Sequence, residues 1–397
     1  NLSIALRTEF ANTGIRVQAV LPGATLTELW GKAGIDIATM PPDRMMAVDE
    51  MVDAALAGAF VLGIAEPQMC GIGGDCFILL KPAGTEDILA LNGSGRSPAG
   101  YDAQALRDQG HKTVPLRGIA PVTLPGAMAA FCRLSDDHGK LGLDRITAPA
   151  IRYAEDGIPV APRVAFDWAD DAPALQGAAR DHYLIGGMVP KVGQIFRAPG
   201  QAQVLRSLAR NGRKGFYEGE VAEDMVTSLR AMGGSHTLDD FAGVTSDYTT
   251  PIHGAYKGTD LYEHPPNGQG ATAILMLNIL SHFDLRTMDP FGTKRAHIEA
   301  EAAKLAYDAR DRFIADPTSR LDHMLAPETA AKLAGLIDPK RAMAAAKPLT
   351  EAVHKDTIYI TVVDRDRMAI SLIYSIFWGF GSGLASSKFG INFQNRG

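Results

Sequence analysis

Cysteine is scarce in this sequence, with three residues in a chain of 397. A small, odd number argues against a framework of disulfides and favours reduced thiols. Cys70 and Cys76 have five residues between them, a spacing that matches no common zinc pattern, and no histidine lies nearby to complete one. We therefore expect Cys70, Cys76 and Cys132 to be small buried packing residues, and we expect neither a metal nor another cofactor.

Long apolar runs and an excess of charge of one sign are also missing. The longest apolar stretch, residues 54–65, is too short to span a bilayer and contains Gly58 and Gly63. We expect it to form a buried helix instead. The formal net charge of -6 gives no electrostatic reason to expect a nucleic acid or an anionic membrane as a partner. Because no basic start followed by an apolar run marks a secretory signal, the expected location is the cytoplasm. With 46% hydrophobic residues, the chain has ample material for a globular core.

An alternating segment near the C-terminus contains the chemically most informative residue. From Thr357 to Val363 the residues alternate between two faces, and this period of two predicts a strand. A second β-rich run, residues 368–377, follows a short turn and predicts a hairpin. If the chain were cut before Thr357, the freed α-amine would lie beside the threonine hydroxyl and could act as its general base. Taken alone, Thr357 is more simply a β-branched residue of a hairpin.

Helical and extended patterns alternate through the rest of the chain, as in an α/β protein. Residues 251–262 predict another hairpin, which turns at Lys257-Gly258. Residues 327–346 are rich in alanine and predict a helix with a break at Pro339, continuing into a linker at 347–355. Clear helical patterns occupy residues 144–156, 219–232 and 297–313.

A series of short motifs runs in order along the chain from about Met51. They include Glu66-Pro67-Gln68, Gly71-Ile72-Gly73-Gly74-Asp75, Leu124-Pro125-Gly126-Ala127, His138-Gly139-Lys140-Leu141, Ala148-Pro149-Ala150-Ile151, Phe216-Tyr217-Glu218-Gly219, Pro265-Pro266-Asn267-Gly268-Gln269-Gly270 and Phe380-Gly381-Ser382-Gly383. In these motifs and their order, residues 51–397 resemble the γ-glutamyltransferase family of N-terminal-nucleophile (Ntn) hydrolases. The resemblance implies an αββα four-layer sandwich, and implies that this sandwich is incomplete at the C-terminus.

The resemblance also implies a proenzyme that cuts itself between Asp356 and Thr357. The products would be a large subunit, residues 51–356, and a small subunit that starts with residues 357–397, and the two would stay together. Whether such heterodimers pair into a homodimer is left open. Thr357 would then attack an amide carbonyl and form an acyl-enzyme, which water or an amine releases. Since the small subunits of the family run well beyond this length, an unprocessed and inactive fragment or chimera is the alternative.

The resemblance assigns further residues around Thr357. Eighteen positions on, Ser375 supplies the hydroxyl that in the family hydrogen-bonds the freed α-amine. Phe377 stands where the family has an asparagine, and Tyr359 stands where it usually has a histidine. We expect these two replacements to alter the contacts with the substrate more than the chemistry of the nucleophile.

The substrate carboxylate is the feature that separates branches of the family. True γ-glutamyl enzymes bind it through an arginine, and the matching position here is Ser94. Arg96 lies two residues along, roughly 6–7 Å away in an extended loop. Arg396 replaces a polar amide residue and could supply a new carboxylate contact, although either arginine could also be an ordinary loop residue. The segment Asn92-Gly93-Ser94-Gly95-Arg96 resembles the branch that contains oxamate amidohydrolase.

We therefore expect a threonine-nucleophile amidohydrolase that acts on a small carboxylate-bearing amide. A γ-glutamyl transferase or glutathione hydrolase is the second hypothesis, and Ser94 argues against it. The first 50 residues differ from the rest: a predicted helix at 2–10, a strand at 14–21 and a Pro22-Gly23 turn resemble the C-terminal part of a short-chain dehydrogenase. They lack its glycine-rich dinucleotide loop and its tyrosine–lysine pair, so we interpret them as a short fused extension without a working cofactor site.

Overall fold

The computed structural model describes residues 24–25, 45–46, 51–315, 320–343, 357–364 and 367–397. Within the first 50 residues it describes β1 (Ala24–Thr25) and β2 (Met45–Met46), which pair in parallel. The predictions for residues 2–21, for the linker at 347–355 and for Asp356 lie outside the described residues.

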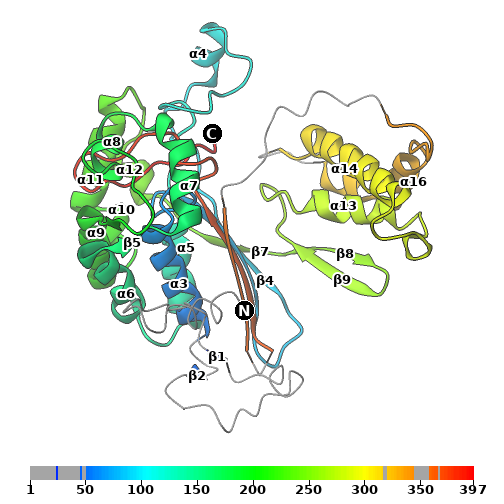
Figure 1. Cartoon of the computed structure of the whole chain (residues 1–397), viewed down its shortest axis with the longest axis horizontal. Helices are drawn as coiled ribbons and strands as arrows, with labels where there is room; N and C mark the ends of the chain where they lie inside the picture. The colour runs from blue at the N-terminus through cyan, green and yellow to red at the C-terminus, as the bar shows by residue number, and fades with distance from the viewer. Residues whose placement is uncertain (1–23, 26–44, 47–50, 316–319, 344–356, 365–366) are drawn as a thin grey trace.

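An antiparallel sheet of five strands forms the centre of the molecule (Figure 1). The C-terminal hairpin enters this sheet through β3, and Ser375 lies opposite Asp75. In the hairpin, Ile358 and Val362 are buried whereas Tyr359 and its neighbours on the same face are exposed, so the predicted alternation is confirmed. The strands, in spatial order, are β10 (Ile358–Val363), β11 (Ala369–Ser375), β3 (Asp75–Lys81), β4 (Leu89–Gly93) and β7 (Asp247–Thr249).

Helices cover one face of this sheet and form the main hydrophobic core with it. Aromatic rings join the layers: Phe131 lies 5.4 Å from Phe60 and 5.2 Å from Tyr374 between ring centroids. The helices predicted at 54–65, 144–156 and 219–232 are confirmed. The helices of this layer are α3 (Met51–Ala65), α5 (Ala127–His138), α6 (Leu143–Asp156), α9 (Pro199–Asn211) and α11 (Gly219–Ala231).

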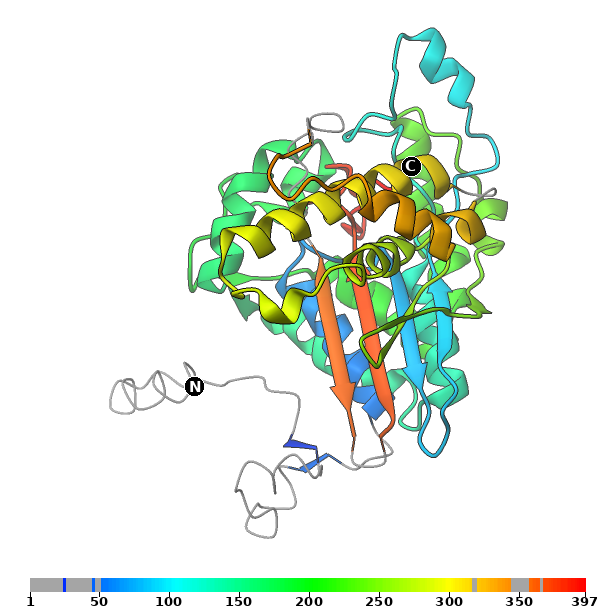
Figure 2. The ribbon, with the colours of Figure 1, turned by 90° about the vertical axis from the view of Figure 1, so that its right-hand side faces the viewer.

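A hairpin and further helices lie over the opposite face of the sheet (Figures 1 and 2). They have a hydrophobic cluster of their own. His264 joins them to the sheet, because its Nε2 lies 2.9 Å from the Ile78 carbonyl oxygen and its ring 5.0 Å from the Phe77 ring. The predicted αββα order of layers is therefore confirmed. This half contains β8 (Ile252–Tyr256), β9 (Thr259–Glu263), α13 (Ala271–Leu280), α14 (Thr293–Phe313), α15 (Leu321–Leu325) and α16 (Pro327–Ala334).

A groove of about 800 Å³ separates the two halves over part of the sheet. Its walls are the outward side chains of the sheet, Phe77, Tyr359 and Ile373 among them, and residues of β9 such as Tyr262. The groove runs alongside β10 and β11. It therefore provides an open surface next to the strands that carry Thr357 and Ser375.

The predicted helix at 327–346 is wrong in length. The structure ends α16 at Ala334, with Gly335 as its C-cap, rather than continuing to Pro339. The chain then turns so that Ile337 becomes buried in the second cluster. The helix therefore ends five residues before Pro339, and Ile337 packs into the second cluster outside the helix. The remaining short elements are α4 (Ala103–Asp108), α7 (Pro162–Asp171), α8 (Ala178–Tyr183), α10 (Lys214–Tyr217), α12 (Leu238–Ala242), β5 (Ile158–Pro159), β6 (Ile195–Phe196) and the 3₁₀ turns Ala172–Ala174 and Leu285–Thr287.

The three cysteines are buried, and all three thiols are free. Their predicted packing role is confirmed. Over the described ranges, no helix has both the length and the apolar character that crossing a membrane requires. In the same part of the chain, no three acidic, histidine or cysteine side chains come together as metal ligands would.

Candidate active site

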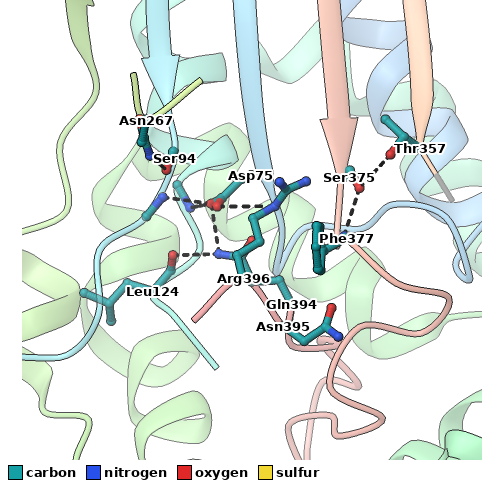
Figure 3. A network of polar contacts seen from close by, with 12 residues as sticks. Asp75, Ser94, Leu124, Asn267, Thr357, Ser375, Phe377, Gln394, Asn395 and Arg396 are labelled. Atoms are coloured by element: carbon teal, nitrogen blue, oxygen red, sulfur yellow. Dashed lines mark hydrogen bonds and ion pairs between the residues drawn. The ribbon is translucent and has the colours of Figure 1, made fainter. Parts of the chain in front are cut away.

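The predicted catalytic residues meet at one edge of the central sheet (Figure 3). Antiparallel pairing alternates the strand directions, so β10 and β3 begin at this edge and β11 and β4 end there. Thr357 precedes β10, Ser375 ends β11 and Asp75 begins β3. Residues far apart in the sequence therefore lie next to one another at the same edge of the sheet.

Thr357 and Ser375 form a pair of hydroxyl groups. The Thr357 Oγ1 hydroxyl donates to Ser375 Oγ at 3.2 Å, and the Phe377 N–H donates to the same Ser375 oxygen at 2.9 Å. Ser375 is fully buried, whereas Thr357 is exposed. A Cβ atom at Gly74 would lie 2.4 Å from the Ser375 carbonyl oxygen, so glycine is required there for close packing. The predicted nucleophile therefore meets the predicted orienting hydroxyl, while its partner in the predicted scissile bond, Asp356, lies outside the described residues.

Phe377 adopts an unusual backbone conformation beside this pair. Its φ of 84° lies in the region that disfavours side chains other than glycine, and such strain is typical of functional sites. The Arg396 guanidinium carbon lies 5.3 Å from the centre of the Phe377 ring, a cation–π distance. Asn395 holds the next residue, since its Oδ1 accepts from the Trp378 N–H at 3.1 Å. The C-terminal segment thus brings Arg396 against Phe377, two residues beyond Ser375, and its role as a substrate contact stays a prediction.

Asp75 contacts three different segments of the chain at this edge of the sheet. Its Oδ1 accepts three hydrogen bonds of 2.9 Å, from the N–H groups of Gly95 and Gly126 and from Gln394 Nε2. Its Oδ2 lies 3.7 Å from Arg396 Nε. Burial raises the pKa of Asp75 to about 6, although the Arg396 charge and the three hydrogen bonds act in the opposite direction. One carboxylate therefore ties the loop after β4 and the turn before α5 to the C-terminal segment.

Ser94 lies at the far end of the same edge. Asn267 Nδ2 donates to Ser94 Oγ at 2.7 Å, and Asn92 Nδ2 donates to Asn267 Oδ1 at 3.0 Å. In the order β10-β11-β3-β4, Ser94 is three strand spacings from Thr357, roughly 14 Å. Arg96 is exposed and lines a pocket of about 470 Å³ together with Ser94. Ser94 and Arg96, in the loop after β4, therefore lie on the opposite side of Asp75 from Thr357 and Ser375.

Tyr359 points into the groove between the two halves. It is 62% exposed, and its hydroxyl lies 2.9 Å from Ser371 Oγ. The structure therefore places Tyr359 on the same strand face as Thr357 but outside the cluster around Ser375.

Four residues of this edge do not follow from the sequence reasoning above: Asp75, Asn267, Gln394 and Asn395. Asp75 does carry a signal, because an acidic residue directly before the apolar run of a buried strand needs a polar partner. Asn267 carries a weaker one, in the Pro-Pro-Asn-Gly-Gln-Gly loop. Gln394 and Asn395 carry none that we recognise, since their partners are distant in sequence.

Comparison with known proteins gives a consistent result. The family model for gamma-glutamyltranspeptidase matches residues 49–397. The chain is 32% identical over 351 residues to the glutathione hydrolase-like YwrD proenzyme of Bacillus subtilis strain 168, a match that covers 87% of this chain and 66% of that protein. It is 33% identical over 358 residues to the oxamate amidohydrolase proenzyme of Klebsiella pneumoniae, again covering 87% and 66%.

A solved structure supports the fold. The cephalosporin acylase from Bacillus halodurans superposes with a TM-score of 0.80 at 33% identity, covering 87% of this chain and 65% of that one. The fold is therefore the αββα sandwich of Ntn hydrolases. The chain spans slightly less than two thirds of the length of these relatives.

Proposed function

Because the chain belongs to the gamma-glutamyltranspeptidase family, we propose that Thr357 is the nucleophile of an amidohydrolase that first cuts its own chain before this residue. The observation that supports the proposal is the 3.2 Å hydrogen bond from Thr357 Oγ1 to the buried Ser375 Oγ. Residues 51–356 would then be the large subunit and residues 357–397 the start of the small one. Two similar proteins bear the word proenzyme in their names, which supports processing of the chain but does not locate the cut.

The proposed reaction uses the new N-terminus as its base. After scission, the α-amine of Thr357 takes the proton from Oγ1 as this oxygen attacks the amide carbonyl. The C–N bond breaks, the leaving amine receives that proton, and an ester to Thr357 remains. Water then attacks the ester, its proton returns to Thr357, and the acid is released. Ser375 keeps the nucleophile oriented through both steps.

The proposed substrate is a small amide that carries a carboxylate. Arg396 is a cation in contact with Phe377, and a guanidinium can bind a carboxylate through two parallel hydrogen bonds. Asp75, which faces Arg396, is two strand spacings from Thr357, roughly 10 Å. Because the arginine side chain covers part of that span, the carboxylate and the scissile carbonyl would be separated by only a few bonds.

A glutathione-like donor is the second candidate, favoured by the 470 Å³ pocket beside Ser94 and Arg96. Such a donor would need to extend over roughly 14 Å from Thr357 to reach that pocket. Parallel assays that measure ammonia release from succinamate and cleavage of glutathione separate the two candidates. We expect turnover of succinamate, with glutathione at least tenfold poorer in kcat/KM.

Self-cleavage is tested by mass spectrometry and a denaturing gel. We expect two fragments that divide before Thr357, a single intact chain for Thr357→Ala, and slower cleavage for Thr357→Ser. Thr361→Ala is the matched control, because Thr361 lies on the same exposed face of β10 but outside the Ser375 cluster. An unsubstituted chain that stays intact, or Thr357→Ala cut at the same bond, would show the proposal to be wrong.

A further inference from the structure

Asp75 holds a buried carboxylate whose two oxygens have different surroundings. The residue is 1% exposed. All three of its hydrogen bonds go to Oδ1, so Oδ2 is left facing Arg396 Nε at 3.7 Å. Within the described residues, Asp75 Oδ2 and Arg396 Nε are both buried without a hydrogen-bond partner. The contact between them is therefore an ion pair rather than a hydrogen bond.

Arg396 needs such a partner. Its side chain is only 25% exposed, and an unpaired cation in that setting is costly. The Phe377 ring contacts the guanidinium but cannot fix its rotation, because a ring face has no directional acceptor. Asp75 faces the Nε side of the guanidinium at 3.7 Å. Its charge favours the side-chain conformation that keeps Nε next to Oδ2, and this conformation leaves the terminal nitrogen atoms on the other side.

We propose that Asp75 is a positioning residue, which holds the Arg396 guanidinium over Phe377 so that its terminal N–H groups meet the carboxylate of the substrate. This inference rests on the proposed function, since it takes Arg396 as the carboxylate-binding residue. It adds that recognition of the substrate carboxylate depends on the buried carboxylate of Asp75, which does not contact the substrate.

The opposing effect is repulsion between Asp75 and the substrate carboxylate. Two features limit it. The three hydrogen bonds to Oδ1 offset the Asp75 charge, and the proposal puts the substrate on the far side of the guanidinium from Asp75. We therefore expect the loss of orientation to outweigh the loss of repulsion when the Asp75 charge is removed.

Protonation of Asp75 should act like its substitution. Burial raises its pKa to about 6, so the ion pair is complete above this pH and is lost below it. The other groups that face Asp75 are Arg396, the Cys76 thiol and the Tyr217 phenol. Burial raises the pKa of Cys76 and of Tyr217 well above their ordinary values, and neither titrates near pH 6. A change of affinity near pH 6 would therefore report Asp75.

The test measures binding of succinamate by calorimetry to the full chain carrying Thr357→Ala, which removes the proposed nucleophile and hence turnover. Because that chain is expected to stay uncleaved, the KM of succinamate is measured in parallel on the self-cleaved chain, with the same substitutions of Asp75 and Arg396. Asp75→Asn is the informative variant, because its remaining carbonyl oxygen can still accept the three hydrogen bonds while its amide group turns a donor toward Arg396. We expect Asp75→Asn to weaken binding at least tenfold at pH 8. We also expect the affinity of the chain with Asp75 to fall between pH 7 and 5, and that of Asp75→Asn to stay constant.

Asp53→Asn is the matched control. Asp53 is equally buried and accepts the N–H groups of Lys140 and Leu141, but it lies near the start of α3. Thermal unfolding shows whether each variant is folded. A double-mutant cycle separates positioning from general damage: in an Arg396→Gln chain, Asp75→Asn should change the affinity less than twofold.

Three results would overturn the inference. If Arg396→Gln weakens binding but Asp75→Asn does not, Arg396 binds the carboxylate without help from Asp75. If both substitutions weaken binding and their effects simply add, Asp75 acts only on the stability of the site. If succinamate fails to bind the chain with both residues intact, the inference and the proposed recognition fail together, whereas the self-cleavage assay still decides the role of Thr357.

Discussion

At the scale of single residues, Ser375 joins the nucleophile to the loop that follows β11. Ser375→Ala removes the oxygen that accepts from both Thr357 Oγ1 and the Phe377 N–H. We expect self-cleavage to slow at least tenfold and the free energy of unfolding to fall by about 1–3 kcal/mol. Ser382→Ala is the control, because this buried serine donates to the Phe393 carbonyl oxygen away from Thr357. Equal cleavage rates in the two variants would contradict the assigned role.

Asp75 gives a pH dependence of stability with a definite sign. Its folded-state pKa of about 6 lies above its ordinary value of 3.8, so the folded chain binds the proton more tightly than the unfolded chain. The stabilising contribution is complete below pH 4 and is lost as the pH rises through 6. The free energy of unfolding of the unsubstituted chain, relative to Asp75→Asn, should therefore fall by about 3 kcal/mol between pH 4 and 7. Urea unfolding at several pH values measures this difference, and a constant or rising difference would contradict it.

The single residues of the site differ in how far the sequence reveals them. Thr357 and Ser375 follow from a local pattern and a motif spacing, and a hairpin of neighbouring strands joins them. Asp75 and Gln394, by contrast, are 319 residues apart, and Ser94 and Asn267 are 173 apart. Such contacts depend on the register of the whole sheet. Residue patterns alone do not contain that register.

At the scale of elements, the loop between β4 and α5 is held by close backbone contact. A Cβ atom on Gly95 would lie 1.4 Å from the Leu124 carbonyl oxygen. Gly95→Ala should therefore lower the free energy of unfolding by about 3 kcal/mol or more, because the backbone must move. Gly58→Ala in α3 is the contrast: a Cβ there meets nothing within 4 Å, and a helical alanine should stabilise by about 0.5–1 kcal/mol. Equal effects in thermal unfolding would contradict this contrast.

The elements themselves were largely predictable, because helical and strand periodicities are local. The hairpin of β10 and β11 and helices α3, α6 and α11 are examples. The error at α16 has the opposite origin. Beyond the end of that helix, Ile337 packs in a cluster with residues of α13 and α14, which are distant in sequence. Alanine content favours a helix but does not specify its last residue.

At the scale of the whole molecule, two of the three hydrophobic clusters of the described residues lie on opposite faces of the central sheet. His264 is one link between them. We expect native-state hydrogen exchange to show that α13 to α16 open with a lower free energy than β3 and β11. His264→Ala should widen the difference, whereas His253→Ala, at an exposed histidine 3.0 Å from Asp260, should not. Identical opening free energies in both halves would contradict the prediction.

The burial of the native sulfhydryls makes site-specific fluorescent labelling of this protein practicable. Cys70 and Cys76 are fully buried and Cys132 is 4% exposed, and burial raises the pKa of Cys132 to about 12. Maleimide reagents, which need an accessible thiolate, should therefore leave the folded chain unlabelled. A cysteine substituted for the exposed Tyr359 would then be a single attachment point for a fluorophore, and its emission would report whatever enters or leaves the space between the two layers.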